Sequence, residues 1–203
     1  MELHALVLAA GAGTRFGGRK LLAPWGTGVL LHGALRSAFS APVASVAVVT
    51  GADAEAISAA VRDFAREDAA KVDLRIVHAA DYGTGVSASL RAGLTALPSS
   101  AEGVFVFLGD MPCIPAAVPP ALADALAPPD ILAAAPVHEG RRGHPVLVAK
   151  ALIPQFLMLR GDEGAKRIIG GLGPALALVP TADPGVLLDV DETADLARLG
   201  PGL

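Results

Sequence analysis

The residues best suited to chemistry lie in a glycine-rich loop near the N-terminus, Leu6-Val-Leu-Ala-Ala-Gly-Ala-Gly-Thr-Arg-Phe-Gly-Gly-Arg-Lys20. Its glycines allow the backbone to take positive φ and to approach a ligand closely, so that several amide N–H groups converge on anionic oxygens. Arg15, Arg19 and Lys20 add full positive charge, and the arginines are suited to bidentate phosphate contacts. The loop therefore predicts a site for a polyphosphate.

Two familiar glycine loops do not match this spacing. A P-loop has Gly-Lys in direct succession, whereas an arginine separates Gly18 from Lys20 here. A dinucleotide fingerprint has the pattern G-x-G-x-x-G, whereas three residues separate Gly13 from Gly17. The spacing argues against a Walker A nucleotidase and against a nicotinamide or flavin enzyme.

A candidate metal ligand is Asp110, in Gly109-Asp-Met-Pro112, which follows the apolar run of residues 104–108. Mg²⁺ bound by one or two carboxylates completes its coordination with substrate phosphates and water, so a carboxylate at the end of a buried strand suits it. The alternative is an aspartate in a turn or at a helix cap, because a proline follows two residues later. The phosphate loop favours the metal.

Asp189 and Asp191 form a second carboxylate pair, in Leu187-Leu-Asp-Val-Asp-Glu-Thr193. In an extended segment the two side chains share one face, so one of them can join Asp110 at a metal. The alternative is that Asp191 or Thr193 caps the helix that follows.

Two further polar segments are candidates for substrate contacts. Tyr82-Gly-Thr-Gly-Val-Ser-Ala-Ser89 precedes an alanine-rich helix, so Ser87, Ser89 and nearby N–H groups can meet an anion or a base edge. Ordinary N-capping is the alternative for Ser87. Arg141-Arg-Gly-His-Pro145, which contains the candidate substrate contact His144, can receive an anionic acceptor or can be a solvated loop.

Composition excludes several classes of protein. The net charge of -4 leaves no basic stripe, which argues against a nucleic acid polymer as partner. The single cysteine, Cys113, excludes an intramolecular disulfide, fits a reducing compartment and has no placed base that would make it a nucleophile. No apolar run reaches about 18 residues, and the first is too short for a signal peptide. We expect a cytoplasmic protein without a membrane anchor.

The scaffold that positions these residues is predicted to be α/β. Short Val/Leu/Ile runs alternate with alanine-rich segments of helical period, a pattern typical of βαβ units and a mostly parallel sheet. With 203 residues, 53% of them hydrophobic, and no linker, residues 1–203 are expected to form a single domain. The predicted strands are 5–9, 45–50, 74–78, 103–108, 131–135 and 145–148, and the predicted helices are 30–40, 54–66, 86–96, 117–127, 149–159, 163–170 and 193–199.

Such a sheet also explains where the special residues lie. Ligands of open parallel sheets bind outside the carboxyl ends of the strands. The glycine loop, the segment that begins at Tyr82, and Asp110 each follow a predicted strand. We therefore expect them to meet at one edge of the sheet.

Five motifs, taken in order, resemble the MobA-like nucleotidyltransferases, and most closely their molybdenum cofactor cytidylyltransferase branch. They are the glycine loop from Leu8 to Lys20, Gly83-Thr-Gly-Val-Ser-Ala-Ser89, Gly109-Asp-Met-Pro112, Gly143-His-Pro145 and Asp189-Val-Asp191. The resemblance spans nearly the whole chain. It implies a Rossmann-like, GT-A-like nucleotidyltransferase fold with three layers, which uses Mg²⁺ and a nucleoside triphosphate.

The resemblance also implies roles for individual residues. It implies a metal at Asp110 and Asp191, catalytic roles for Lys20, Arg15 and Asp110, and an acceptor contact at His144. Ala-Ala-Gly replaces the Ala-Gly-Gly of the guanylyl branch, so Ala10 favours CTP. One departure is Asp191-Glu-Thr-Ala194, where the family commonly has Asp-Thr-Pro-Glu. The implied nucleotide contacts are Leu8, Ala9, Ala10, Gly11, Ala12, Gly13, Thr14, Arg15, Lys20, Ser87 and Ser89.

The reaction expected from this resemblance is transfer of CMP from CTP to the phosphate of molybdenum-carrying molybdopterin, with release of pyrophosphate. A phosphate monoester, with a second pKa of about 6, is already anionic at neutral pH and needs no general base. The alternatives are the same chemistry on a sugar phosphate, on methylerythritol phosphate or on molybdopterin with GTP, and a non-catalytic nucleotide- or cofactor-binding chaperone. A recipient molybdoenzyme or its chaperone is a further expected partner.

Overall fold

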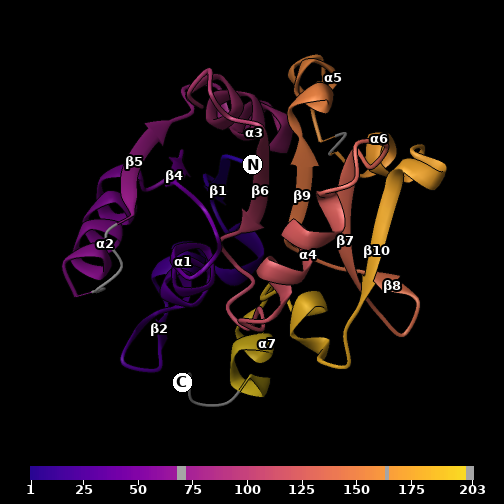
Figure 1. The fold of residues 1–203 in the computed structure, drawn as a ribbon. Helices are drawn as coiled ribbons and strands as arrows, with labels where there is room; N and C mark the ends of the chain where they lie inside the picture. The colour runs from indigo at the N-terminus through magenta and orange to yellow at the C-terminus, as the bar shows by residue number, and fades with distance from the viewer. Residues whose placement is uncertain (68–71, 163–164, 200–203) are drawn as a thin grey trace.

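A computed structural model describes residues 1–67, 72–162 and 165–199 of the chain (Figure 1). Within these ranges one eight-stranded sheet has the order β10-β7-β9-β6-β1-β4-β5, with β8 paired to β7. A separate hairpin consists of β2 (Pro24–Trp25) and β3 (Gly28–Val29). The pairings are mostly parallel, which confirms the expected α/β class.

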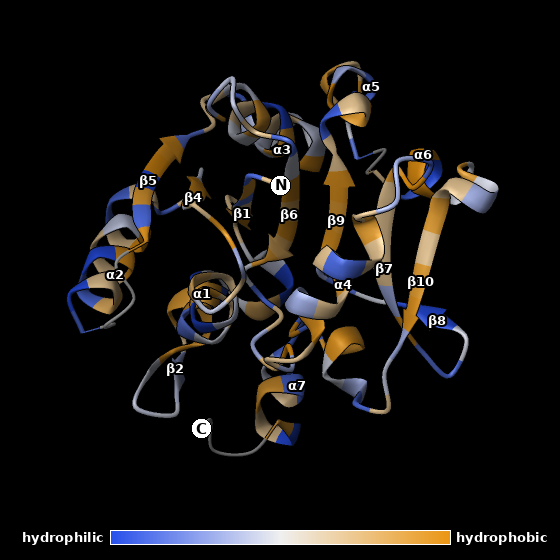
Figure 2. Cartoon of the chain, in the orientation of Figure 1, coloured by the Kyte–Doolittle hydropathy of each residue, from blue (hydrophilic) through white to orange (hydrophobic). Residues whose placement is uncertain are grey.

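The half of the sheet formed by the first strands is parallel throughout. Its central strand, β1 (Leu3–Ala9), lies between β4 (Ser45–Thr50) and β6 (Gly103–Leu108), and β5 (Asp73–His78) forms the edge. The central strands are covered on both faces and therefore read as continuous apolar runs, which is why the sequence predicts them closely. Figure 2 shows these strands as predominantly hydrophobic.

The other half of the sheet is mixed. β7 (Ala133–His138) and β10 (Leu176–Pro180) are parallel to each other, whereas β9 (Val146–Ala149) is antiparallel to both β6 and β7. The short β8 (Arg141–Arg142) also pairs antiparallel with β7. The sequence pattern missed β10, because its five residues end in a proline, which is a poor signal for a strand.

Helices cover both faces of the sheet and complete three layers. Side chains of β1 alternate between the faces, with Ala5 and Val7 in one apolar core and Leu6 in the other. The first core is closed by α1 (Leu30–Phe39), α2 (Ala54–Glu67) and α4 (Val118–Leu126). The second is closed by α3 (Val86–Thr95), α5 (Ile153–Leu157) and α6 (Lys166–Gly170).

One helix prediction for the second half of the chain was too long. The helix expected over 149–159 is a 3-10 turn, Lys150–Leu152, followed by α5, because β9 extends to Ala149 and Pro154 is tolerated only near the start of a helix. The helix expected over 163–170 is described from Lys166, and its residues 163–164 lie outside the described residues. No helix in the described part of the chain is long and apolar enough to cross a membrane.

Candidate active site

A cleft of about 670 Å³ opens at the carboxyl ends of β1 and β6. It is lined by Leu8, Ala10, Gly11, Ala12 and Thr14 of the glycine loop, by residues 82–86 and Ser89 at the start of α3, and by Leu108, Asp110 and Asp162. The loops after β1, β5 and β6 therefore meet at one edge, as a parallel sheet requires of its ligand site.

The glycine loop folds back on itself before it reaches Lys20. Gly13 has φ +60°, and its carbonyl accepts hydrogen bonds from the amides of Phe16 and Gly18, both at 3.0 Å. A Cβ at Gly13 would lie 2.8 Å from Cβ of Lys20. Any larger residue would push the two ends of the loop apart, so this glycine sets the position of the lysine.

Lys20 joins three segments that are far apart in the sequence. Its Nζ donates to Oδ2 of Asp110 at 2.6 Å and to Oδ1 of Asp191 at 3.3 Å. Nη1 of Arg15 donates to Oδ2 of Asp191 at 3.1 Å. The lysine side chain is only 12% exposed, whereas that of Arg15 is 77% exposed. The ion pair between Arg15 and Asp191 is exposed and adds little to the stability of the fold. The Arg15 side chain is therefore available to a ligand.

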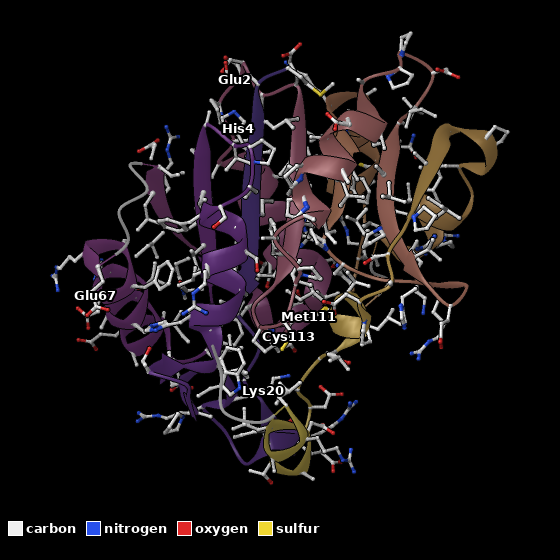
Figure 3. All side chains as sticks on the ribbon, turned by 60° about the horizontal axis from the view of Figure 1, so that its bottom comes forward. Glu2, His4, Lys20, Glu67, Met111 and Cys113 are labelled. Carbon is white, nitrogen blue, oxygen red and sulfur yellow. The ribbon has the colours of Figure 1, made fainter. Side chains whose placement is uncertain are left out.

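Both carboxylates are held in place by backbone contacts. The amide of Gly109 donates to the Leu8 carbonyl at 3.0 Å, and the amide of Val190 donates to the Asp110 carbonyl at 3.0 Å. Helix α7 (Thr193–Arg198) begins with a capping box formed by Glu192 and Asp195, so neither Asp191 nor Thr193 is its cap. Figure 3 shows Lys20 beside this C-terminal segment.

Asp195 orients Asp191 through the backbone. Its Oδ2 accepts hydrogen bonds from the amides of Glu192, at 2.9 Å, and of Asp191, at 3.1 Å. These two hydrogen bonds hold the pKa of Asp195 below its usual value, and the one from the Glu192 amide has the larger effect. The capping carboxylate therefore stays charged and keeps the start of α7 against the glycine loop.

The Lys20 cluster suits a divalent cation. Two carboxylate oxygens, from Asp110 and Asp191, converge on one cationic nitrogen. Mg²⁺ is commonly bound by one or two carboxylates, with substrate phosphates and water completing its shell. Within the described residues no group of three or more His, Cys, Asp or Glu side chains could hold a metal. Asp189 is exposed and has no part in these ion pairs.

The two serines of α3 are placed differently. Ser89 lines the cleft, whereas Ser87 is fully buried and its Oγ accepts a hydrogen bond from Arg91 at 3.2 Å. The amide of Ser87 donates to the Gly161 carbonyl, and that of Val86 to Oδ1 of Asp162, both at 3.2 Å. The structure therefore brings Ser89 to the cleft but not Ser87. Tyr82, the first residue of the segment that the sequence marks as a candidate for substrate contacts, also lines the cleft, and so does Asp162, which no sequence signal marked.

His144 lies beside the cleft, in a second cavity of about 310 Å³. This cavity shares Leu8, Val86 and Leu108 with the cleft. Burial lowers the pKa of His144, and this effect is opposed by a hydrogen bond to the Val106 backbone and by the charges of Asp110 and Asp189, while Arg142 adds to it. Nδ1 of the imidazole is buried and has no hydrogen-bond partner in the described structure.

A second polar network lies at the opposite end of the sheet from Lys20 (Figure 3). Nδ1 of His4 is 2.7 Å from Oγ of Ser45, and its Nε2 is 3.2 Å from Oε1 of Glu2. The series resembles a hydrolase triad, but Ser45 is only 6% exposed and lines none of the cavities described above. These residues therefore tie the start of β1 to β4 and stand apart from the cleft.

Comparisons with known proteins assign the chain to a family. The model of the MobA-like NTP transferase domain matches residues 5–176. Molybdenum cofactor cytidylyltransferase of Escherichia coli K12 is 27% identical over 155 residues, which cover 76% of this chain and 74% of that protein. Nicotine blue oxidoreductase of Paenarthrobacter nicotinovorans is 29% identical over 209 aligned positions, covering 96% and 94%.

A solved structure of a mycobacterial protein has a similar fold. Rv0371c of Mycobacterium tuberculosis H37Rv, crystallised in complex with manganese, superposes with a TM-score of 0.75 at 25% identity and covers 98% of each chain. The family match spans most of the chain and includes the glycine loop, Asp110 and His144. The chain therefore belongs to the MobA-like NTP transferase family and is a nucleotidyltransferase.

Proposed function

We propose that the protein transfers CMP from CTP to the phosphate of molybdenum-carrying molybdopterin and releases pyrophosphate. The observation that carries the proposal is the cluster of Lys20, Asp110 and Asp191 beside the glycine loop, because it combines a cation for phosphates with two carboxylates for a metal. The E. coli relative bears the name of this activity.

The reaction needs alignment and charge neutralisation more than proton transfer. An oxygen of the acceptor phosphate attacks the α-phosphorus of CTP, and the bond from that phosphorus to the β-phosphate oxygen breaks. Pyrophosphate leaves with the electron pair of that bond. Because the acceptor is already anionic near neutral pH, no residue has to remove a proton. The barrier is then mainly repulsion between anions and the positioning of the two substrates.

The residues of the glycine loop supply much of this neutralisation. Gly11 and Ala12 line the cleft, Lys20 pairs with Asp110, and Arg15 pairs with Asp191. We propose that the loop amides and these two cations bind the triphosphate. Preorganised donors of this kind stabilise charge as it develops on the leaving group. A divalent cation held by Asp110 and Asp191 would supply further Lewis-acid neutralisation of the phosphates. The manganese complex of the mycobacterial relative supports a metal, and we propose Mg²⁺ for this chain.

We propose CTP as the donor because Ala10, which the resemblance associates with the cytidylyl branch, lies in the cleft. Ala10 is buried in its wall, and Ser89 lines it at the start of α3. Ala9 and Ser87, which the resemblance also implies as nucleotide contacts, are buried. We propose that they support the cleft wall. We propose that a recipient molybdoenzyme or its chaperone takes up the product.

The test is an assay of the purified chain with Mg²⁺ or Mn²⁺, each of the four NTPs and a panel of phosphate acceptors. The acceptors are molybdopterin with and without molybdenum, a sugar phosphate and methylerythritol phosphate. The expected result is pyrophosphate and a cytidine dinucleotide only with CTP and the molybdenum-loaded acceptor.

Three outcomes would contradict the proposal. They are a preference for GTP, turnover with the sugar phosphates alone, and no pyrophosphate with any pair of substrates. One relative is named an oxidoreductase, so a parallel assay measures whether the protein oxidises NADH or NADPH. We expect no oxidation of either.

A further inference from the structure

We propose that the 310 Å³ cavity beside the cleft binds the ring system of the acceptor, and that it selects a flat nitrogen heterocycle over a polyol. We call this cavity the ring pocket. It is formed by the apolar residues Leu90, Val106, Val146 and Ile169, by His144, and by the side chains it shares with the cleft. The inference rests on the proposed nucleotidyl transfer, because it assigns the acceptor of that reaction.

The position of the ring pocket fits the body of an acceptor. Leu8 and Leu108, at the ends of β1 and β6, line both the pocket and the cleft, and Asp110 follows Leu108 by two residues. A molecule whose phosphate lies near Asp110 can therefore extend its body into the pocket. A volume of about 310 Å³ lies at the lower end of the range of roughly 300–1,000 Å³ for ligand pockets.

The lining of the ring pocket decides between classes of acceptor. Most of its walls are aliphatic side chains from α3, β6, β9 and α6, which offer no hydrogen bonds to a ligand, and its polar side chains are those of His144, Arg142 and Lys166. A sugar phosphate or a methylerythritol phosphate would bury several hydroxyl groups there, and each buried hydroxyl without a partner weakens binding. A planar heterocycle has apolar faces for these walls and a polar edge that needs only a few partners.

His144 is placed to meet that polar edge. Its Nδ1 is buried without a hydrogen-bond partner in the described structure, which is rare for a polar atom in a folded protein. Burial also lowers its pKa, so the imidazole is neutral at pH 7. A neutral imidazole can exchange hydrogen bonds with ring N–H groups and ring nitrogens. We therefore assign His144 as a specificity-determining residue for the acceptor.

Two cations at the same pocket suit an acceptor with a second anionic group. Arg142 and Lys166 belong to its lining, and Nη2 of Arg142 donates to the Lys166 carbonyl at 3.4 Å. The remainder of the lining carries no carboxylate. An acceptor with one phosphate near Asp110 and another negative group on its ring system would have the second group neutralised by these two cations.

The test uses pterin, which has the ring system and no phosphate, as a fluorescent probe titrated into the full chain with Mg²⁺ and CTP. Pterin should bind the wild type, and an excess of ribose 5-phosphate should not displace it. His144→Leu keeps a side chain of similar size without hydrogen bonds and should weaken pterin binding at least tenfold. Its affinity for CTP, measured separately, should stay within twofold.

A second variant fills the pocket. Ala165→Phe places a large side chain in the lining and should abolish pterin binding, whereas Ala59→Phe, on the exposed side of α2, is the matched control. Melting temperatures identify any variant that does not fold, and the other variant then decides. Equal pterin binding by all folded variants, or displacement by ribose 5-phosphate, would overturn the ring pocket.

The outcome is separate from that of the proposed function. Pterin binding is measured without turnover, so absence of pyrophosphate in every assay would refute the reaction while the binding pattern still tests the pocket. Conversely, turnover with molybdopterin that is unchanged in both His144→Leu and Ala165→Phe would refute the pocket alone.

Discussion

The parallel and mixed halves of the sheet present two different surfaces to the same edge. The parallel half, β5-β4-β1-β6, carries a polar cleft lined by Asp110, whose carboxylate pairs with Lys20 and through it with Asp191. The mixed half, which begins at β9, joins β1, β6 and α3 in a mostly aliphatic pocket in which burial lowers the pKa of His144. The difference indicates that charge governs recognition in the first region, whereas the second combines aliphatic walls with one histidine and two cations.

The largest expected effect comes from Asp110→Ala, which removes a carboxylate from the polar cleft. Turnover with CTP should fall about a thousandfold or more, because a metal ion contributes several kcal/mol of charge stabilisation and each 1.36 kcal/mol is tenfold in rate. Pyrophosphate release measures the effect. Pterin binding should stay within twofold, and nearly unchanged turnover would remove Asp110 from the mechanism.

Lys20→Met should lower turnover about 100-fold to 1,000-fold, the usual loss for one donor that stabilises developing charge. It also leaves the carboxylates of Asp110 and Asp191 without the cation that bridges them. Added Mg²⁺ should therefore raise the melting temperature of this variant more than that of the wild type, because ligands that bind only the folded state stabilise it. An equal rise in both proteins would contradict the metal assignment.

Asp191→Asn should lower turnover about tenfold, roughly 1.4 kcal/mol, and raise the Mg²⁺ concentration needed for half-maximal rate. The effect is smaller than that of Asp110→Ala, because Asp191 is more exposed, at 46% against 24%. Asp189→Asn is the matched control, since this carboxylate is two residues away and exposed. Equal losses in the two variants would show that Asp191 has no special role.

The same contrast explains what the sequence could predict. The strands of the parallel half are buried on both faces and so appear as uninterrupted apolar runs, and the glycine loop is a local pattern of fifteen residues. The predicted β1, β4 and β6 agree with the structure to within two residues. The resemblance to known motifs singled out Lys20, Asp110 and Asp191, although 171 positions separate the first from the last.

The mixed half was harder to predict, because its features come from packing. β10 is one short edge strand, and the antiparallel direction of β9 depends on which neighbours it meets. The ring pocket combines Leu8, Val106 and Ala165, which share no sequence pattern. Ser87 and Ser89 are alike in sequence, yet only the second faces the cleft, because residues two apart on a helix point in different directions.

The smallest expected effect is on stability in acid, and it compares a partly buried histidine from each half. Burial lowers the pKa of His144 in the mixed half and of His32 on α1 in the parallel half. The unfolded chain binds a proton at each histidine near pH 6.5, whereas the folded chain resists it to lower pH. Folding stability is therefore greatest above pH 6.5 and falls as the pH drops toward the folded pKa values.

His144→Gln should remove its share of this slope, up to about 1.4 kcal/mol per pH unit between pH 6.5 and the lower folded pKa. Urea unfolding at pH 7.5, 6.5 and 5.5 measures the slope. His32→Gln, the matched control, should also reduce the slope, because burial is the first cause of the lowered pKa at both sites. Only His144→Gln should also alter pterin binding. A slope that stays the same in His144→Gln would mean that the pKa of this imidazole is the same in the folded and the unfolded chain, which would contradict its burial in the ring pocket.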